Sequence, residues 1–549
     1  MKKFKFYLTL PSLLLILLLS FQFKFSSAKE LIEGSQREKF LNDDSLALQL
    51  RSKITALKLK GFELTGIQLI RQASYTPKAT NNLLTNLPPF CLISANLKPT
   101  VGSLIRIELW LPLDNWNGRL LGTGNGGGAG SIAYESLAGG IRHGYATVNT
   151  DMGTSRGGAN AAVDNPEVWK DFGYRATHEM TVVAKHLVKM YYGKKQHHSY
   201  FVGCSTGGQQ GLMEAQRFPN DYNGIIAGAP ANNRTHLHTS FLWNYAIANK
   251  NGKALFTKED LAYISKQIID NYTVRSGGAP KDDFLTNPGR VDINVDSLFG
   301  CKQNSGAPCL GFEKMEALKK IYKGPVNPQT HAQIYTSFPL GSENIGGGLA
   351  LQQTKAGADD LFYLFKWAFG KDFDPMKFDF DKDVEKLDLQ LAPLLNANNP
   401  DLSAYKKNGG KIIMYTGTAD PLVPYQDAAN YYNRVVAQQK GLDKAQTFFK
   451  YYLLPGMAHC AGGPGLNGFS RNILVDLVDW VEKAIVPNEI VAAASNCCDT
   501  NGPPRLQRPV YPYPQFAKYT GGDINLVSSY IGVADNNGKL LVPAAKYLK

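Results

Sequence analysis

The stretch Ser199–Gly208, which reads S-Y-F-V-G-C-S-T-G-G, is the feature that most limits the folds open to this chain. Tyr200–Val202 is predicted to form a buried strand, and the small residues around Ser205 permit the sharp strand-to-helix turn that lifts a hydroxyl clear of the backbone. A helix over Gln209–Phe218 would direct its free N–H groups back toward the serine. Because a bare G-x-S-x-G is common in ordinary turns, Ser205 is a candidate nucleophile only if the rest of the chain supplies its partners.

Those partners follow in the order that a serine hydrolase on a parallel sheet requires, with the acid before the histidine. The predicted strand Lys411–Tyr415 runs into T-G-T-A-D-P, which places Asp420 in a tight turn. The predicted strand Phe448–Leu454 runs into P-G-M-A-H-C, which places His459 in a loop. Taken singly, the aspartate could cap a turn and the histidine could be an ordinary loop residue. Together with Ser205 they predict a catalytic triad in which the histidine moves the proton and the aspartate orients it.

A tetrahedral intermediate at this serine also needs N–H donors for its oxyanion. The backbone N–H of Thr206 is one candidate, because it directly follows the nucleophile. The glycine-rich run Gly122–Gly130 is expected to supply the other, and we favour Gly127 without separating it from Gly126. A phosphate cradle is the alternative for this run, but it lacks the Lys-Ser/Thr of a P-loop and the spaced glycines of a dinucleotide fingerprint.

The remaining pattern predicts an α/β protein. Antiparallel strands are expected at Cys91–Leu97 and Leu104–Leu111, and further short strands at Leu120–Gly122, Tyr145–Asn149 and Gly224–Ala227. Helices are expected at Arg175–Tyr192, Asp427–Gln438 and Ile473–Ile485. Strands that alternate with helices imply a mainly parallel sheet. The alternation stops near residue 232 and resumes near 404, which predicts a catalytic domain of residues 29–231 and 404–549 interrupted by a lid domain of residues 232–403.

The N-terminus has the composition of a signal peptide. Three early lysines precede an apolar run from Leu8 to Phe21, and Ser26 and Ala28 suit the cleavage site. We expect residues 1–28 to be removed near Ala28 and the protein to be exported, either to a periplasm or outside the cell, with no membrane association afterwards. An uncleaved membrane anchor is the alternative.

The charge and the cysteine content limit which partners, metals and disulfides are expected. Removal of the leader, with its four lysines and no acids, lowers the formal net charge from +13 to +9, and the basic residues are scattered, so no nucleic acid partner is expected. Seven cysteines in an exported chain should mostly form disulfides. None of them has the spacing of zinc ligands, so we expect them to bind no metal.

Cys204 precedes the candidate serine and Cys460 follows the histidine. A disulfide between them would hold the two catalytic loops together, and two buried thiols are the alternative.

The motifs of this chain resemble those of the tannase and feruloyl esterase family, which includes the terephthalate monoester hydrolases. The resemblance covers most of the mature chain and rests on L-L-G-T-G-N-G-G-G-A-G, Y-R-A-T-H-E-M-T, Y-F-V-G-C-S-T-G-G-Q-Q-G-L-M-E-A-Q-R-F-P, A-G-A-P-A, G-T-A-D-P-L-V-P and G-M-A-H-C-A-G-G-P. It implies an α/β-hydrolase fold with a lid and the hydrolysis of aromatic acid esters. It also implies that Ser205, Asp420 and His459 form the triad and that Cys204 pairs with Cys460, while Cys301 and Cys309 match a small lid disulfide.

The chain departs from the family in its calcium loop. The equivalent stretch, Val274–Val291, has valines at both bracketing cysteine positions and keeps Asp282 as an aspartate, with Arg275 and Gly278 at other aspartate positions. Asp292 and Asp296 lie nearby. Because calcium needs six to eight oxygen ligands, we expect no tightly bound calcium and no other cofactor. Cys91, Cys497 and Cys498 have no assignable partners.

These observations predict an exported serine esterase that hydrolyses esters of aromatic acids, of the feruloyl type, through an acyl-enzyme. Gallate esters and terephthalate monoesters are alternatives within the family. A serine peptidase or acyltransferase would use the same triad, and a binding protein on a retained scaffold is the third class. Tyr363, Phe365, Trp367 and Phe369 are candidates to stack on the aromatic acid, although most are expected in the lid core. The oligomeric state is left open.

Overall fold

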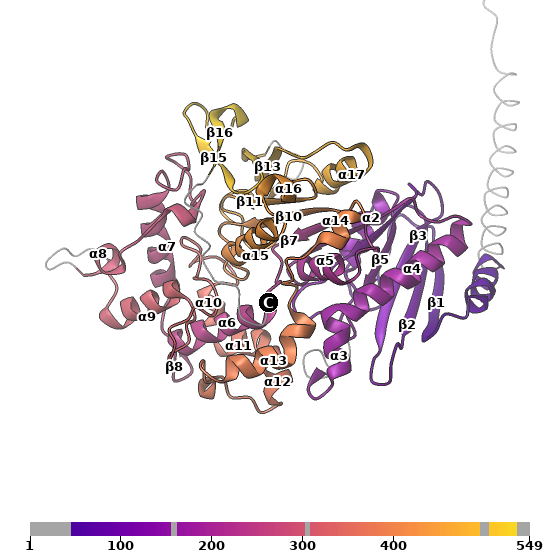
Figure 1. The fold of residues 1–549 in the computed structure, drawn as a ribbon, viewed down its shortest axis with the longest axis horizontal. Coiled ribbons are helices and arrows are strands. Elements are labelled where there is room, and N and C mark those ends of the chain that lie inside the picture. The colour runs from indigo at the N-terminus through magenta and orange to yellow at the C-terminus, as the bar shows by residue number, and fades with distance from the viewer. Residues whose placement is uncertain (1–44, 155–161, 302–307, 495–503, 535–549) are drawn as a thin grey trace, which may run out of the picture.

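The computed structural model describes residues 45–154, 162–301, 308–494 and 504–534. The expected signal peptide, Cys497 and Cys498 lie outside these residues. Figure 1 shows a central sheet with helices on both sides, and helices α6 to α13 gathered at its left and lower edges. The fold is therefore the α/β class that the sequence predicts.

One large sheet organises the chain. Its strands lie in the order β1-β2-β3-β5-β4-β6-β7-β10-β11. They are β1 (Phe62–Ile70), β2 (Phe90–Leu97), β3 (Ile105–Pro112), β4 (Arg119–Thr123), β5 (Ala146–Thr150), β6 (His198–Cys204), β7 (Gly224–Gly228), β10 (Lys411–Gly417) and β11 (Phe449–Leu454). The first three strands and β5 pair antiparallel, and the pairs from β5 to β11 are parallel. Since parallel strands end at one edge, the turns after β4, β6, β7, β10 and β11 share that edge.

The two faces of the sheet are buried by different helices. On β6, Phe201 packs in a cluster with α5 (Thr206–Arg217) and α15 (Tyr425–Gln438), whereas the adjacent Tyr200 packs with α17 (Ile473–Lys483). Helix α4 (Ala176–Tyr192) covers the same face of the sheet as Phe201. Helix α2 (Tyr134–Arg142) packs against Trp110 on the face that carries Tyr200. Successive strand residues point to opposite faces, so continuous apolar strands are what two covered faces require. The shorter elements of this part are α3 (Pro166–Lys170), the π-helix η2 (Asp171–Arg175) and α16 (Leu442–Gln446).

Several predicted boundaries were wrong by a few residues. Helix α5 begins at Thr206 rather than Gln209, so it starts directly after the candidate nucleophile. Helix α17 ends at Lys483 because Ala484 adopts a left-handed conformation, and β3 spans Ile105–Pro112 rather than Leu104–Leu111. Strand β1 was missed, because a bulge between Leu64 and Gly66 breaks its alternation.

Between β7 and β10, most of the regular elements are helices. It contains α6 (Arg234–Ala248), β8 (Asn249–Lys250), β9 (Lys253–Ala254), α7 (Lys258–Tyr272), η3 (Pro288–Arg290), α8 (Val295–Phe299), α9 (Phe312–Lys323), α10 (Leu349–Gln352), α11 (Lys355–Leu361), α12 (Tyr363–Phe369), η4 (Pro375–Lys377), α13 (Asp383–Leu395) and α14 (Ser403–Lys407). One part has its own core, with Ile264, Leu318 and Ile321 at its centre. The other part, including Phe365 and Trp367 of α12, joins the main core beside α4. These two aromatic residues are core, as expected.

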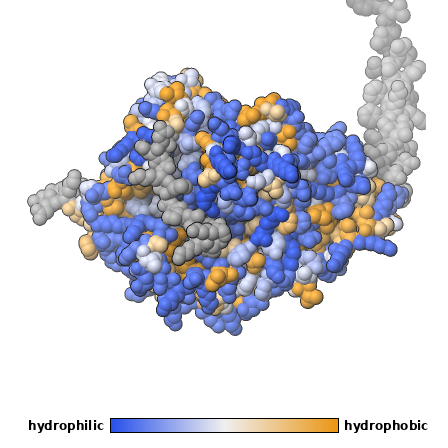
Figure 2. Space-filling view, in the orientation of Figure 1, coloured by the Kyte–Doolittle hydropathy of each residue, from blue (hydrophilic) through white to orange (hydrophobic). Residues whose placement is uncertain are grey.

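The C-terminal segment adds short antiparallel sheets that the sequence did not reveal. Strands β12 (Gly468–Phe469), β13 (Ile490–Ala494) and β14 (Leu506–Val510) form one, and β15 (Gln515–Tyr519) and β16 (Tyr530–Ala534) form another, with η5 (Val527–Ser529) between them. Figure 2 shows a mostly hydrophilic face with hydrophobic residues in scattered groups. Within the described residues, no helix has both the length and the apolar character needed to cross a membrane.

Candidate active site

Ser205 occupies a strained turn between β6 and α5. Its φ of 64° and ψ of −118° lie in a region that residues other than glycine seldom adopt. The Ser205 N–H donates to the carbonyl of Gly228 at 3.0 Å, which fixes the turn to the end of β7. This is the geometry expected of a nucleophile raised at the carboxyl edge of the sheet.

The glycines around Ser205 are required by close backbone contacts. A Cβ at Gly203 would lie 2.5 Å from the carbonyl carbon of Gly207, and a Cβ at Gly208 would lie 2.3 Å from the carbonyl oxygen of Gly228. Both distances are shorter than side chains tolerate, so a larger residue would move the turn. Gly203, the first glycine of G-x-S-x-G, and Gly208, which directly follows the pattern, are therefore required for steric reasons.

Asp420 and His459 meet at the same edge of the sheet. Asp420, in the turn after β10, is fully buried, and its Oδ1 accepts from the N–H groups of Leu422 and Val423, both at 2.9 Å. Its Oδ2 lies 2.8 Å from Nδ1 of His459, which follows β11. Because the carboxylate is an acceptor, Nδ1 donates and Nε2 is left to accept a proton. Burial alone would lower the pKa of His459, but the charge and hydrogen bond of Asp420 outweigh burial and raise it above the usual value.

A disulfide joins the turn that carries Ser205 to the loop that carries His459. Cys204 and Cys460 are bonded, with their Cα atoms 5.9 Å apart and a sequence separation of 256. Cys301 and Cys309 form the second bond. Both expected pairs are thus present in the structure. Cys91 is buried and unpaired among the described residues, and burial raises its pKa to about 12.

Thr206 connects the start of α5 to the glycine-rich turn after β4. Its Oγ1 donates to the carbonyl of Gly127 at 2.6 Å, and the Gly207 N–H donates to the carbonyl of Asn125 at 2.8 Å. Gly126 and Gly127 both line the cavity described below, and a Cβ at either would meet no atom within 4 Å. The structure therefore brings the expected oxyanion donors, Thr206 and the glycine turn, together.

Arg234 was missed by the sequence analysis. This residue is 2 % exposed, and its guanidinium donates to Oγ1 of Thr206 at 2.6 Å, to Oε1 of Gln209 at 2.8 Å and to the hydroxyl of Tyr363 at 2.7 Å. It begins α6, directly after β7, so its place at the carboxyl end of a parallel strand is the signal that could have identified it. Among the described residues, its recorded hydrogen-bond partners are all neutral.

These groups surround one cavity of about 620 Å³. Ser205, Thr206 and His459 line it, while Asp420 contacts the histidine. Its other walls are largely apolar and include Leu237, His238, Phe241, Tyr363, Leu422 and Val423. Of the four α12 aromatic candidates, Tyr363 is the one on this wall. The size and the mixture of apolar walls with a few polar groups are typical of a small-molecule site.

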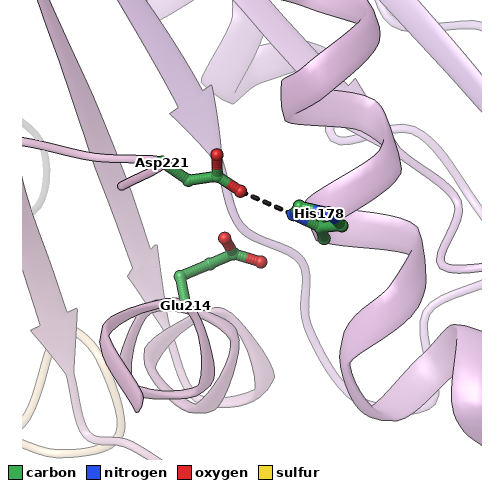
Figure 3. Close-up of side chains that lie close together, drawn as sticks. All are labelled: His178, Glu214 and Asp221. Carbon is green, nitrogen blue, oxygen red and sulfur yellow. Dashed lines mark hydrogen bonds and ion pairs between the residues drawn. The ribbon is translucent and has the colours of Figure 1, made fainter. Parts of the chain in front are cut away.

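A second cluster lies away from this cavity. Figure 3 shows His178 of α4, Glu214 of α5 and Asp221 pointing toward one another, with ligand atoms within 4.8 Å. Asp221 already accepts from Nδ1 of His178 at 2.7 Å and from Nζ of Lys185 at 3.0 Å. Burial, and then the neighbouring Asp221, hold the pKa of Glu214 well above its usual range, and among the described residues neither of its buried carboxyl oxygens has a hydrogen-bond partner. The lysine ammonium beside the carboxylates disfavours a metal ion, and the hydrogen bonds of Asp221 to His178 and Lys185 are best explained as structural.

The stretch that resembles a calcium loop is held by an ion pair instead. Asp282 accepts from the Ala279 N–H at 2.9 Å and from Nη2 of Arg508, on β14, also at 2.9 Å. Both charged side chains are at most 3 % exposed. A guanidinium therefore occupies one oxygen of the one aspartate retained from the motif, and this donor set does not fit calcium.

This chain is similar to several known proteins. The family model described as tannase and feruloyl esterase matches residues 93–533. An uncharacterized esterase of Xanthomonas campestris pv. campestris is 31 % identical over 538 residues, covering 89 % of this chain and 92 % of that protein. Feruloyl esterase B of Aspergillus niger is 28 % identical over 447 residues, covering 78 % and 84 %. The crystal structure of feruloyl esterase B from Aspergillus oryzae superposes with a TM-score of 0.81 at 24 % identity, covering 88 % of this chain and all of that one.

The two disulfides should differ in their effect on activity. We expect the double variant Cys204→Ala/Cys460→Ala to lose about 5 kcal/mol of stability by the loop-entropy estimate and at least about tenfold in kcat, since the catalytic loops separate. The matched control Cys301→Ala/Cys309→Ala removes a disulfide that closes a far shorter loop. This variant should lose about 2.5 kcal/mol of stability with little change in kcat. Thermal melts and ester turnover check both, and full activity of the first double variant would contradict this role.

The Asp282–Arg508 pair should make calcium dispensable. Treatment with a chelator is expected to leave the melting temperature and activity unchanged. Arg508→Ala should destabilise the fold by about 3 kcal/mol, because it leaves a buried carboxylate unpaired, while Arg505→Ala, at an exposed neighbour, should have little effect. A melting temperature that falls with chelator and recovers with calcium would show that the prediction is wrong.

Proposed function

Because this chain belongs to the tannase and feruloyl esterase family, we propose that it is an exported serine esterase that hydrolyses esters of aromatic acids, of the feruloyl or hydroxycinnamoyl type. The observation that carries the proposal is the convergence of strained Ser205 and the His459–Asp420 pair on one largely apolar cavity. The relatives named feruloyl esterase support ester hydrolysis and this substrate class. Gallate esters and terephthalate monoesters are the alternatives.

In the proposed reaction, Oγ of Ser205 attacks the ester carbonyl while Nε2 of His459 takes its proton. The negative charge that forms on the carbonyl oxygen is stabilised by the N–H groups of Thr206 and Gly127. The intermediate then collapses, the alcohol leaves with the proton from His459, and an acyl group remains on Ser205. Water, activated by His459, attacks this acyl group and releases the acid, which restores the free serine. Asp420 holds the imidazole and stabilises its cation.

Other parts of the chain fit this role. We propose that residues 232–403 act as a lid, because α6 and α12 supply Leu237, Phe241 and Tyr363 to the cavity wall. The two disulfides support export, since such bonds persist in oxidising compartments. A peptidase or acyltransferase with the same triad would be distinguished by amide turnover or by transfer to an added alcohol.

A small ester panel tests the proposal. The purified mature protein should hydrolyse at least one of methyl ferulate, chlorogenate, methyl gallate, a terephthalate monoester and a short alkyl ester. Ser205→Ala should reduce that turnover by about 10⁴-fold or more, because it removes the nucleophile. Ser470→Ala, at an exposed serine, is the matched control and should keep full activity. No turnover of any ester, or full activity of Ser205→Ala, would contradict the proposal.

The pH dependence of turnover follows from His459. This residue must be neutral to accept the serine proton, and its pKa is raised above the ordinary 6.5. We therefore expect kcat/KM to fall on the acid side with a midpoint above pH 6.5. Asp420→Asn removes the charge that raises the pKa, so it should move this midpoint to lower pH and lower kcat by about 10⁴-fold. A midpoint below pH 6.5 in the unaltered protein would contradict this assignment.

A further inference from the structure

His238 is a buried side chain on the cavity wall that the triad does not use. It lies on α6, is 3 % exposed, and lines the cavity together with Ser205 and His459. Its Nδ1 lies 2.6 Å from the carbonyl oxygen of Leu361. Because a carbonyl can only accept, Nδ1 carries the proton and donates it. The tautomer is therefore fixed by a backbone group outside the catalytic machinery.

The imidazole of His238 stays neutral. Burial, and then the neighbouring guanidinium of Arg234, lower its pKa to about 3. In a neutral ring with the proton on Nδ1, Nε2 is an acceptor with no proton to give. Within the part of the chain that the structure describes, no hydrogen bond to Nε2 is recorded. Nε2 is not among the fully buried side-chain atoms that lack a partner, so it is accessible from the cavity that His238 lines, where a bound ligand can donate a hydrogen bond to it.

The surroundings of His238 suit a flat aromatic ring. The ring of Tyr363 lies edge-on to it at 5.0 Å, and that of Phe241 at 5.5 Å. All three line the cavity. The recorded hydrogen bonds of the nearby Arg234 go to Thr206, Gln209 and Tyr363, which hold its charge beside the nucleophile turn. The acceptor at His238 is thus set among aromatic walls.

We propose that Nε2 of His238 accepts a hydrogen bond from a phenolic hydroxyl on the acyl ring of the substrate. This inference rests on the proposed esterase function and names the residue that would recognise the ring hydroxyl of such a substrate. A terephthalate monoester would present carboxylate lone pairs to an acceptor that has no proton to give. His238 is on this account a specificity-determining residue, and it takes no part in proton transfer at the ester.

The test compares methyl 4-hydroxycinnamate with methyl 4-methoxycinnamate and methyl cinnamate, neither of which can donate. The unaltered protein should prefer the hydroxy ester by about tenfold in kcat/KM, the discrimination expected of one buried hydrogen bond. His238→Leu should lose this preference, so that the hydroxy ester suffers more than the other two. His238→Gln, whose amide oxygen can accept, should recover part of it. Phe241→Leu changes the same wall without changing the acceptor and should affect all three esters alike.

The outcomes separate this inference from the esterase assignment. Equal turnover of the hydroxy and methoxy esters by the unaltered protein would overturn the role of His238 while leaving the esterase function intact. This comparison uses the unaltered protein alone, so it does not depend on whether a variant folds. A preference for monomethyl terephthalate over the hydroxy ester would also overturn it. If none of these esters is hydrolysed and the wider panel also fails, the proposed function itself is wrong.

Discussion

The backbone crossing at Ser205 is the constraint on which the rest of the site depends. The turn holds a residue with positive φ between a strand and a helix that approach so closely that Gly203 admits no side chain. Such strain persists only where surrounding contacts determine it, and here they do. The Ser205 N–H donates a hydrogen bond to the carbonyl of Gly228 at the end of β7. The Gly207 N–H donates a hydrogen bond to the carbonyl of Asn125 in the turn after β4. Three parallel strands therefore fix the position of one hydroxyl before any partner residue is considered.

The candidate partners of Ser205 are held in place by different kinds of interaction. Asp420 is held by backbone N–H groups of its own turn, so its free oxygen is directed at His459. The Cys204–Cys460 bond then ties the histidine loop to the serine strand across 256 residues. Helix α6 contributes Arg234 and His238, both deeply buried. The site thus combines a rigid hydrolase edge with an insertion that shapes the cavity, and we interpret the first as the source of the chemistry and the second as the source of selectivity.

The sequence predicted what local patterns encode. Apolar strands followed by glycine-rich turns identified the parallel sheet, and Asp420 and His459 lie together as their order predicted. Strand β1 was missed because its bulge disrupts the alternation, and the start of α5 was placed three residues late because glycines hide its first turn. The Asp282–Arg508 pair could not be predicted, since its members have a sequence separation of 226 and no sequence motif contains both residues. The tautomer of His238 depends on a carbonyl 123 residues away, and no sequence pattern encodes that contact.

The most direct test of the account is to trap the acyl-enzyme. The purified protein would be mixed with a slowly deacylating hydroxycinnamate ester, quenched in acid within the first turnover, digested and examined by mass spectrometry. The account predicts a hydroxycinnamoyl group on the peptide that contains Ser205, which disappears as turnover proceeds and is absent from Ser205→Ala. Free acid released with no covalent adduct at any time, or an adduct on a different residue, would contradict the central claim that Ser205 is the nucleophile.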